Sequence, residues 1–269
     1  MSQVTGKVIW ITGASSGIGE ALAYALARKK VYLILSARRK EELERVKGNC
    51  HPLAQPDIRL LPFDLAEEAT LKLITEAATH LFGRVDILIN NGGISQRSLA
   101  KETSLAVDRK IMEVDFFGTI ALTKYLLPHF LQRKSGHFVV VTSVMGIIGT
   151  PYRSGYAAAK HALHGFFDSL RAELWKDSKS IFITIICPGW VRTSISLNAL
   201  IGDGSKLNQM DSTTSDGLDP KLVAKRIIHA IEKRKEEVYI GGMKEVAAVY
   251  LKRYLPGIFT SLVRKAIVR

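Results

Sequence analysis

The chain has 269 residues, 47% of them hydrophobic, so it can bury a large core, and we predict one α/β domain over residues 1–269. Its two cysteines, Cys50 and Cys187, form neither a disulfide framework nor a metal-binding motif, so no metal is expected. The formal charge of +13 comes without a nucleic-acid-binding motif or a long apolar run, so we predict a cytoplasmic protein, at most associated with a membrane surface, and no nucleic-acid partner.

Short apolar runs rich in Val and Ile alternate along the chain with amphipathic stretches. The apolar runs predict strands at residues 7–11, 31–36, 58–62, 85–90, 136–142, 181–187 and 237–240. The amphipathic stretches predict helices at residues 17–28, 40–46, 67–82, 105–132, 152–175 and 220–234. This alternation is typical of a parallel sheet with helices on both faces, so we expect a Rossmann-type, doubly wound α/β fold.

The first predicted strand passes into a helix through Thr12-Gly13-Ala14-Ser15-Ser16-Gly17-Ile18-Gly19. Glycines let the backbone approach a pyrophosphate, and the N–H groups at a helix start hold negative charge. The spacing G-x-x-x-G-x-G is a variant of a common dinucleotide fingerprint, although glycines also serve ordinary turns. We predict a cofactor-binding turn made by Gly13, Ser15, Ser16, Gly17, Ile18 and Gly19.

The end of the second predicted strand indicates which nicotinamide cofactor binds. NAD-selective sites usually hold the ribose with an acidic residue here, whereas this chain has Ser36-Ala37-Arg38-Arg39. Arg38 and Arg39 can pair with a 2′-phosphate through charge-assisted hydrogen bonds, so the expected cofactor is NADP(H). The alternative is that both arginines only cap a surface turn.

Tyr156 and Lys160 are four residues apart in a predicted helix, so their side chains lie on one face. A neighbouring ammonium stabilises a phenolate and lowers the pKa of a tyrosine, which ordinarily titrates near ~10. Ser143 follows the fifth predicted strand, at the edge where open α/β sheets bind ligands, and can polarise a carbonyl. The three residues predict acid/base chemistry on a carbonyl or alcohol.

Two later segments lie outside the predicted alternation. Residues 192–219 form a long irregular stretch that mixes Ile195, Leu197, Leu200, Ile201 and Met210 with Gly, Ser, Asp and Thr, as in a mobile substrate lid; an insertion without a role is the alternative. Residues 246–269 are basic and amphipathic. This carboxyl-terminal segment is expected to lie on an anionic membrane, to close over the pocket mouth, or to pack at a subunit interface.

Together these residues resemble the short-chain dehydrogenase/reductase family over nearly the whole chain. The resemblance implies a seven-stranded sheet in the order 3-2-1-4-5-6-7, catalysis by Ser143, Tyr156 and Lys160, and a homodimer or homotetramer assembled through the two long central helices. It also implies further cofactor contacts from Asp64, Leu65, Asn91, Tyr156, Lys160, Pro188, Gly189, Val191 and Thr193. Three segments, at residues 152–156, 197–200 and 255–257, are similar to one subgroup whose members carry an amino-terminal membrane anchor, a feature not expected of this chain.

Two positions depart from the family pattern. Gly92 stands where the family usually has Ala, and Asp115 stands where it usually has a catalytic Asn that helps to hold a water in the proton path. We expect Asp115 to keep this role, with an altered pH dependence. The expected activity is reduction of an apolar carbonyl compound, such as a lipid, steroid or retinoid, or oxidation of the matching alcohol. The alternatives are an NADP(H)-binding regulatory or scaffold protein with an impaired site, and a membrane-surface module.

Some residues are left without a predicted role in chemistry. His161 and His164 lie three apart on the helix of Tyr156, but no third metal ligand is evident in the sequence, so we interpret them as ordinary histidines. Met145, Ile147 and Ile148 follow Ser143 and are equally consistent with a substrate pocket and with core packing.

Overall fold

The structure, a computed structural model, describes residues 3–209 and 211–264. Seven parallel strands form one sheet in the order β3-β2-β1-β4-β5-β6-β7, which confirms the predicted fold class and strand order. The strands are β1 (Val8–Thr12), β2 (Tyr32–Ser36), β3 (Ile58–Leu60), β4 (Ile87–Asn90), β5 (Gly136–Val141), β6 (Ile181–Pro188) and β7 (Glu237–Ile240).

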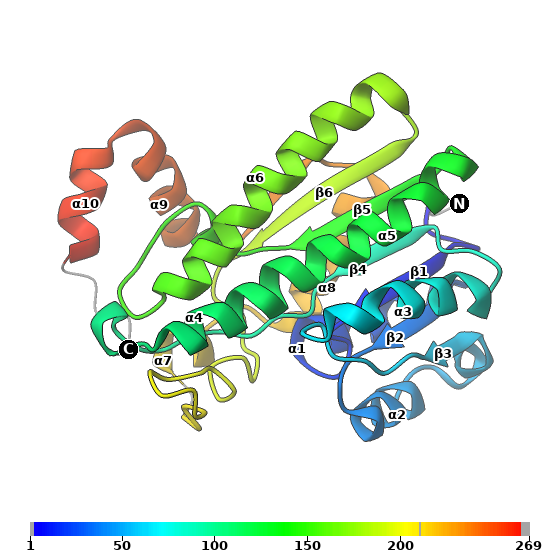
Figure 1. Ribbon diagram of the computed structural model, residues 1–269, viewed down its shortest axis with the longest axis horizontal. Coiled ribbons are helices and arrows are strands. Elements are labelled where there is room, and N and C mark those ends of the chain that lie inside the picture. The colour runs from blue at the N-terminus through cyan, green and yellow to red at the C-terminus, as the bar shows by residue number, and fades with distance from the viewer. Residues whose placement is uncertain (1–2, 210, 265–269) are drawn as a thin grey trace.

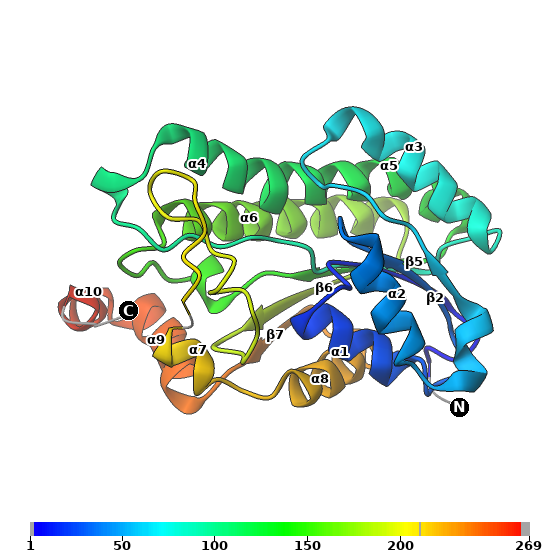
Figure 2. The same cartoon turned by 90° about the horizontal axis from the view of Figure 1, so that it is seen from below.

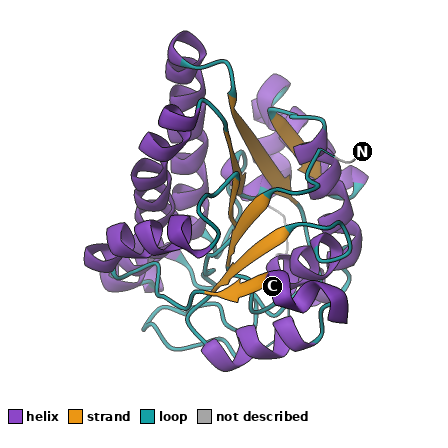
Figure 3. Cartoon of the chain, turned by 90° about the vertical axis from the view of Figure 1, so that its right-hand side faces the viewer, coloured by secondary structure: helices purple, strands orange, loops and turns teal. Residues whose placement is uncertain are grey.

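Helices cover both faces of this sheet, as Figures 1 and 3 show. The helices are α1 (Gly17–Leu26), α2 (Lys40–Gly48), α3 (Glu68–Leu81), α4 (Leu105–Ile111), α5 (Gly118–Arg133), α6 (Ser154–Asp177), α7 (Ser212–Ser215), α8 (Pro220–Glu232), α9 (Met243–Tyr254) and α10 (Pro256–Arg264). Three 3₁₀ turns lie at Pro52–Asp57, Ala100–Glu102 and Val144–Gly146, and a π-helical turn lies at Met112–Phe117.

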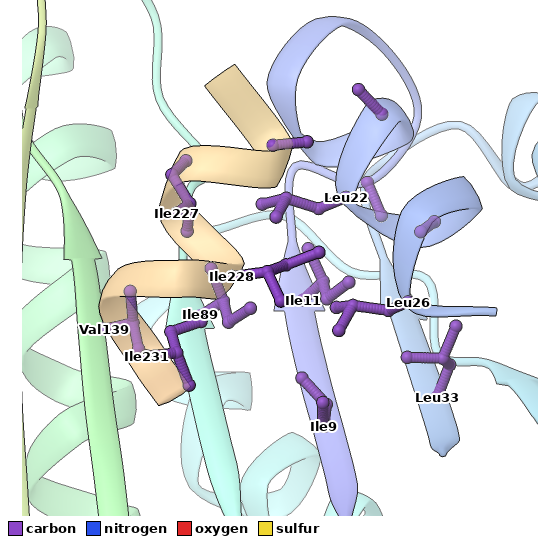
Figure 4. Close-up of a cluster of buried hydrophobic side chains, with 14 of the residues drawn as sticks. Ile9, Ile11, Leu22, Leu26, Leu33, Ile89, Val139, Ile227, Ile228 and Ile231 are labelled. Atoms are coloured by element: carbon purple, nitrogen blue, oxygen red, sulfur yellow. The ribbon is translucent and has the colours of Figure 1, made fainter. Parts of the chain in front are cut away.

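The central strands are apolar on both sides because each side faces a helical layer. All five residues of β1 are buried, and successive side chains point to opposite faces of the sheet. Ile9 and Ile11 join the core beneath α1 and α8, which Figure 4 shows in close-up. Val8 and Trp10 join the second core, beneath α3, α5 and α6. The uninterrupted apolar runs of the sequence therefore reflect burial between two layers.

The predicted helix over residues 105–132 is instead interrupted. Between α4 and α5, residues Met112–Phe117 form a π-helical turn, which adds a residue to one turn of the helix. This turn directs the fully buried Asp115 toward the sheet, where Oδ1 accepts a hydrogen bond from the backbone N–H of Ile94 at 2.7 Å. The interruption lies beside the carboxyl edge of the sheet, where parallel strands bind ligands.

The two segments outside the predicted alternation are partly ordered into helices. Residues 192–219 contain the short α7, and their irregular part lies beside residues 96–104, where the N–H of Ser104 donates to the carbonyl of Gly202 at 2.9 Å (Figure 2). The carboxyl-terminal segment forms α9 and α10, which project at one end of the molecule (Figure 1). Met210 and residues 265–269 lie outside the described residues. Within residues 3–209 and 211–264, no helix combines the length and apolarity of a membrane span.

Candidate active site

A cavity of about 410 Å³ opens along the carboxyl edge of β1, β2, β4, β5 and β6. Every residue predicted to bind the cofactor or take part in catalysis borders this cavity, except Gly19. The topology explains the convergence, because β1 and β4 are neighbours whose connections run to opposite sides of the sheet.

The glycine turn is shaped for close approach of a ligand to the backbone. Gly13 and Gly17 have φ of +63° and +58°, in the left-handed region that favours glycine. A Cβ at Gly19 would lie 2.2 Å from the carbonyl oxygen of Gly13, so Gly19 serves packing inside the turn and does not face the cavity. The side-chain amide of Asn91 donates to the carbonyls of Thr12 and Gly13, at 3.1 and 3.2 Å. These contacts hold the backbone of the turn in place at the edge of the cavity.

The far end of the cavity carries the two arginines after β2. Arg38 is 60% exposed at its side chain, and its Nη1 lies 3.8 Å from Oδ2 of Asp64. Arg39 precedes α2 and also borders the cavity. Such an exposed and loosely paired guanidinium can turn toward a ligand phosphate at little cost, because exposed ion pairs contribute only about 0–1 kcal/mol.

Ser143 follows β5 in an extended conformation and is held by the backbone on both sides. Its Oγ accepts a hydrogen bond from the N–H of Met145 at 3.1 Å and donates to the carbonyl of Pro188 at 3.3 Å. Pro188 ends β6, so the serine is positioned by two neighbouring strands. The long bond to Pro188 leaves the hydroxyl able to donate to a ligand oxygen instead.

Tyr156 and Lys160 project from α6 into the same cavity. The Nζ of Lys160 lies 5.5 Å from the ring centroid of Tyr156 and 3.1 Å from Oδ2 of Asp115. Burial acts to lower the pKa of Lys160, but the attraction of Asp115 and Tyr156 outweighs it, so the pKa of Lys160 is raised. Burial raises the pKa of Asp115, against the opposing pull of Lys160. The site therefore holds a buried ammonium beside a phenol, the pair that proton transfer to a carbonyl oxygen requires.

Comparison with known proteins agrees with this geometry. The sequence model described as short chain dehydrogenase matches residues 7–200. The chain belongs to the short-chain dehydrogenase family. It is 44% identical to human dehydrogenase/reductase SDR family member 7, over 94% of this chain and 76% of that protein. It is 40% identical to member 7B from Bos taurus, over 96% and 81%. Both the predicted family and the narrower resemblance are thus confirmed.

A solved structure of a family member agrees in fold. The short chain dehydrogenase/reductase from Burkholderia phymatum, in complex with NAD, superimposes with a TM-score of 0.83 and covers 96% of each chain. It is 23% identical in sequence to this chain, so the likeness concerns the fold alone.

Gln96 was not predicted from the sequence, yet it positions the helix that carries Tyr156. It is fully buried, and its Oε1 accepts hydrogen bonds from the N–H groups of Gly155 at 2.7 Å and Tyr156 at 3.4 Å. These donors belong to the first turn of α6 and have no partner within the helix. Because the bond joins residues 59 positions apart, no local pattern could have indicated it.

Several basic residues at the cavity were also absent from the predictions. Arg97 follows Gln96, and Arg153 immediately precedes α6; both border the cavity, and their side chains are 8% and 1% exposed. The sequence did not indicate that these residues lie at one site, because they belong to segments that are far apart along the chain.

The carboxyl-terminal helices pack beside the catalytic region. Val249 of α9 and Phe259 of α10 share an apolar cluster with Met145 and Tyr156. The ammonium of Lys252 donates a hydrogen bond to the carbonyl of Ile147. The described part of residues 246–269 thus packs against the catalytic region, and the three positions expected for this segment stay predictions. Its outer side stays apolar, with Tyr254, Leu255, Ile258 and Leu262 all more than half exposed.

His161 and His164 do not converge on a common ligand set. His161 contacts the carbonyl of Ala157 and the ammonium of Lys252, whereas Nε2 of His164 lies 3.1 Å from the hydroxyl of Thr142 and 3.7 Å from Sγ of Cys187. One ring nitrogen of His164, Sγ of Cys187 and a carboxylate oxygen of Glu237 all lie within 4.8 Å of one another. The sequence could not indicate this group, since its members come from α6, β6 and β7.

Proposed function

We propose that the protein is an NADP(H)-dependent oxidoreductase that transfers a hydride between the nicotinamide and a carbonyl compound or secondary alcohol. The observation that carries the proposal is the pairing of Lys160 with Asp115 beside the ring of Tyr156, in a cavity continuous with the glycine turn. A buried ammonium next to a tyrosine stabilises the phenolate that remains after the hydroxyl has given up its proton, so the two side chains together are suited to general acid/base chemistry.

The side chains have separate tasks in this proposal. The nicotinamide, when bound, supplies or accepts the hydride. In reduction, Tyr156 donates its proton to the carbonyl oxygen while the hydroxyl of Ser143 donates a hydrogen bond to the same oxygen. Lys160 stabilises the phenolate that remains and holds the ribose hydroxyls. Asp115 keeps Lys160 charged and in position, and the same groups act in reverse during oxidation.

The remaining cofactor contacts follow the shape of the cavity. The pyrophosphate would lie on the turn from Gly13 to Gly19, and a 2′-phosphate would pair with Arg38 and Arg39. The adenine and nicotinamide ends would be held by Asp64, Leu65, Asn91, Pro188, Gly189, Val191 and Thr193. The preference for NADP(H) is argued from the two arginines, since the Burkholderia phymatum protein of the same fold was solved with NAD.

The substrate end of the cavity supports an apolar compound. Val144, Met145, Ile195 and Leu200 border it, and the last two belong to residues 192–219, which would act as the lid. Exposed apolar side chains on α5 and α6, among them Tyr125, Leu131 and Trp175, support assembly into a homodimer or homotetramer through these helices.

An assay with a panel of apolar ketones and aldehydes, using NADPH and NADH in parallel, tests the proposal. We expect turnover of at least one carbonyl compound, faster with NADPH at limiting cofactor. Tight NADPH binding without turnover of any carbonyl or alcohol would contradict it. That result would favour the alternative suggested by the departure at Asp115, an NADP(H)-binding regulatory or scaffold protein with an impaired site.

A further inference from the structure

The charges that border the cavity are unevenly distributed. Among the described residues, its acidic members are Asp64 and Asp115, which lie beside Arg38 and Lys160 respectively. Besides Arg39, which we assign to the 2′-phosphate, four more cations border the cavity, namely Arg97, Lys110, Arg153 and Lys206. The cofactor phosphates account for cations near the glycine turn, but these four come from other elements.

Arg153 is the cation most closely tied to the catalytic tyrosine. It lies three residues before Tyr156, is 1% exposed, and its guanidinium carbon stands 4.7 Å from the ring centroid of Trp190. Burial, reinforced by Arg97, lowers the pKa of Arg153 to about 9, and Asp211 and Tyr156 act on it in the opposite direction. Arg153 therefore keeps its charge at neutral pH, within electrostatic reach of the phenol.

Arg97 and Arg153 both lie beside the carboxylate of Asp211. Oδ2 of Asp211 lies 3.0 Å from Nη2 of Arg97 and 3.6 Å from Nη2 of Arg153. Its Oδ1 accepts a hydrogen bond from the N–H of Thr214, and Asp211 is not among the residues that border the cavity. Two guanidinium groups that border the cavity thus share one carboxylate that does not border it, so this part of the cavity wall carries net positive charge.

This charge count is more than a structural latch requires. Arg97 already makes a two-point contact with Asp211, because it also donates to the Asp211 carboxylate through Nε at 3.0 Å. Adding a second buried guanidinium to the same carboxylate costs desolvation energy and introduces repulsion between the two arginines. An anionic ligand group would offset both costs through charge-assisted hydrogen bonds.

We propose that the natural substrate is an apolar carbonyl compound or alcohol that carries an anionic group, a carboxylate or a phosphate, and that Arg153 and Arg97 bind this group. The inference rests on the proposed function, since it names the substrate class of the same site. Arg153 sets the distance between the anionic group and the reacting carbon, because it is fixed to the start of the helix that carries Tyr156.

Matched substrates test the proposal. Methyl-ketone acids of increasing chain length are compared with their methyl esters, and hydroxyketone phosphates with the free hydroxyketones, in NADPH-dependent reduction. We expect kcat/KM to favour at least one anionic form by about ten- to hundredfold, the size of a hydrogen bond to a charged group. The two series distinguish a carboxylate from a phosphate ligand.

Variants connect the preference to its residues. Arg153→Met should bring the ratio of kcat/KM between the anionic and neutral forms close to about one, whereas Arg28→Met, an exposed arginine away from the cavity, should leave the ratio unchanged. Asp211→Asn should increase the ratio, because it removes the competing charge while the amide oxygen can still accept from Thr214. The dissociation constant for NADPH, measured by fluorescence, should change little in all three.

Equal kcat/KM for the anionic and neutral forms in the wild type would overturn the inference, as would a preference that survives in Arg153→Met. Turnover of the esters would still support the proposed function. If no compound is turned over, the proposed function fails. Whether Arg153 and Arg97 form an anion-binding subsite is then tested by calorimetry, with the acid and its ester each titrated into the NADPH complex. Tighter binding of the acid that is lost in Arg153→Met supports it, and equal binding overturns it.

Discussion

The ammonium of Lys160 lies 3.1 Å from Oδ2 of Asp115, and both side chains are almost completely buried. The family resemblance leads us to expect an asparagine at this position, whereas Asp115 forms a direct charge pair with Lys160. The π-helical turn Met112–Phe117 makes the contact possible, because it directs Asp115 toward the cavity while Ile94 donates a backbone hydrogen bond to its other oxygen.

Replacing Asp115 with Asn should move the alkaline limb of the pH profile. Burial lowers the pKa of Lys160, but Asp115 raises it by more. The ammonium therefore persists at pH values above the ordinary pKa of a lysine, about 10.4. Without the carboxylate, burial dominates, the pKa of Lys160 falls, and the ammonium is lost at lower pH. We expect activity in both proteins, with the alkaline limb of kcat against pH displaced to lower pH in Asp115→Asn.

Glu113→Gln, in the same π-helical turn, serves as the matched control and should leave this limb in place. Coincident profiles of wild type and Asp115→Asn would place Asp115 outside the proton path. An inactive wild type with an active Asn variant would instead indicate an impaired site.

Tyr156→Phe should lower kcat by about 10² to 10⁴, the usual contribution of a general acid or base. The substitution removes the proton but keeps the ring beside Lys160 and in the apolar cluster with Met145. The dissociation constant for NADPH should therefore stay near that of the wild type. Tyr250→Phe, an exposed tyrosine of α9, is the control and should retain full activity. A kcat near the wild-type value in Tyr156→Phe would refute its assignment as the acid.

The sequence predicted the fold and the main features of the site because these follow from local patterns. Apolar runs and glycine spacing are visible along the chain, and strands that end at one edge must bring Gly13 and Ser143 together. The contacts of Gln96 with the start of α6, and of Arg97 with Asp211, join residues 59 and 114 positions apart. Such contacts depend on packing, which a single sequence does not reveal.

The interruption of the helix at residues 112–117 shows a second limit. Helical periodicity predicts an unbroken helix over residues 105–132, since one added residue changes the pattern of apolar side chains only slightly. The contacts of the buried Asp115 with Ile94 and Lys160 come from other segments and favour the wider turn.

Arg38→Asp should shift the cofactor preference from NADPH toward NADH. The substitution removes a cation that can pair with the 2′-phosphate and places a carboxylate where it would repel that phosphate. It also lies near Asp64, whose carboxylate is 3.8 Å from Arg38 in this structure, so the repulsion should be strong. Titration of each cofactor by fluorescence gives both dissociation constants, with Arg28→Met as the control for loss of a surface arginine. A wild type that binds NADH as tightly as NADPH would contradict the interpretation of Arg38 and Arg39.

The outer side of α10 should bind anionic membranes. Ile258 and Leu262 lie one helical turn apart and are 53% and 57% exposed, and the basic residues Arg253 and Arg264 flank them. Apolar side chains next to cations are typical of helices that lie in a lipid interface. Phe259 on the inner side packs near Met145, so truncation of the helix would disturb the pocket, whereas substitution of the outer residues should not.

We expect the wild type to co-sediment with vesicles that contain phosphatidylserine and to bind vesicles of phosphatidylcholine more weakly, because the cations add attraction to anionic lipid. Replacing Ile258 and Leu262 together by Asp should abolish co-sedimentation, since it removes apolar contact and adds repulsion. Leu53→Asp is the control and should bind like the wild type. Leu53 is an exposed apolar residue in the turn before β3, and β3 and β7 are the two opposite edge strands of the sheet. Equal sedimentation with both lipids, or unchanged sedimentation of the double variant, would contradict membrane binding and favour a contact between subunits. The mass of the wild type in solution would then reveal the oligomer.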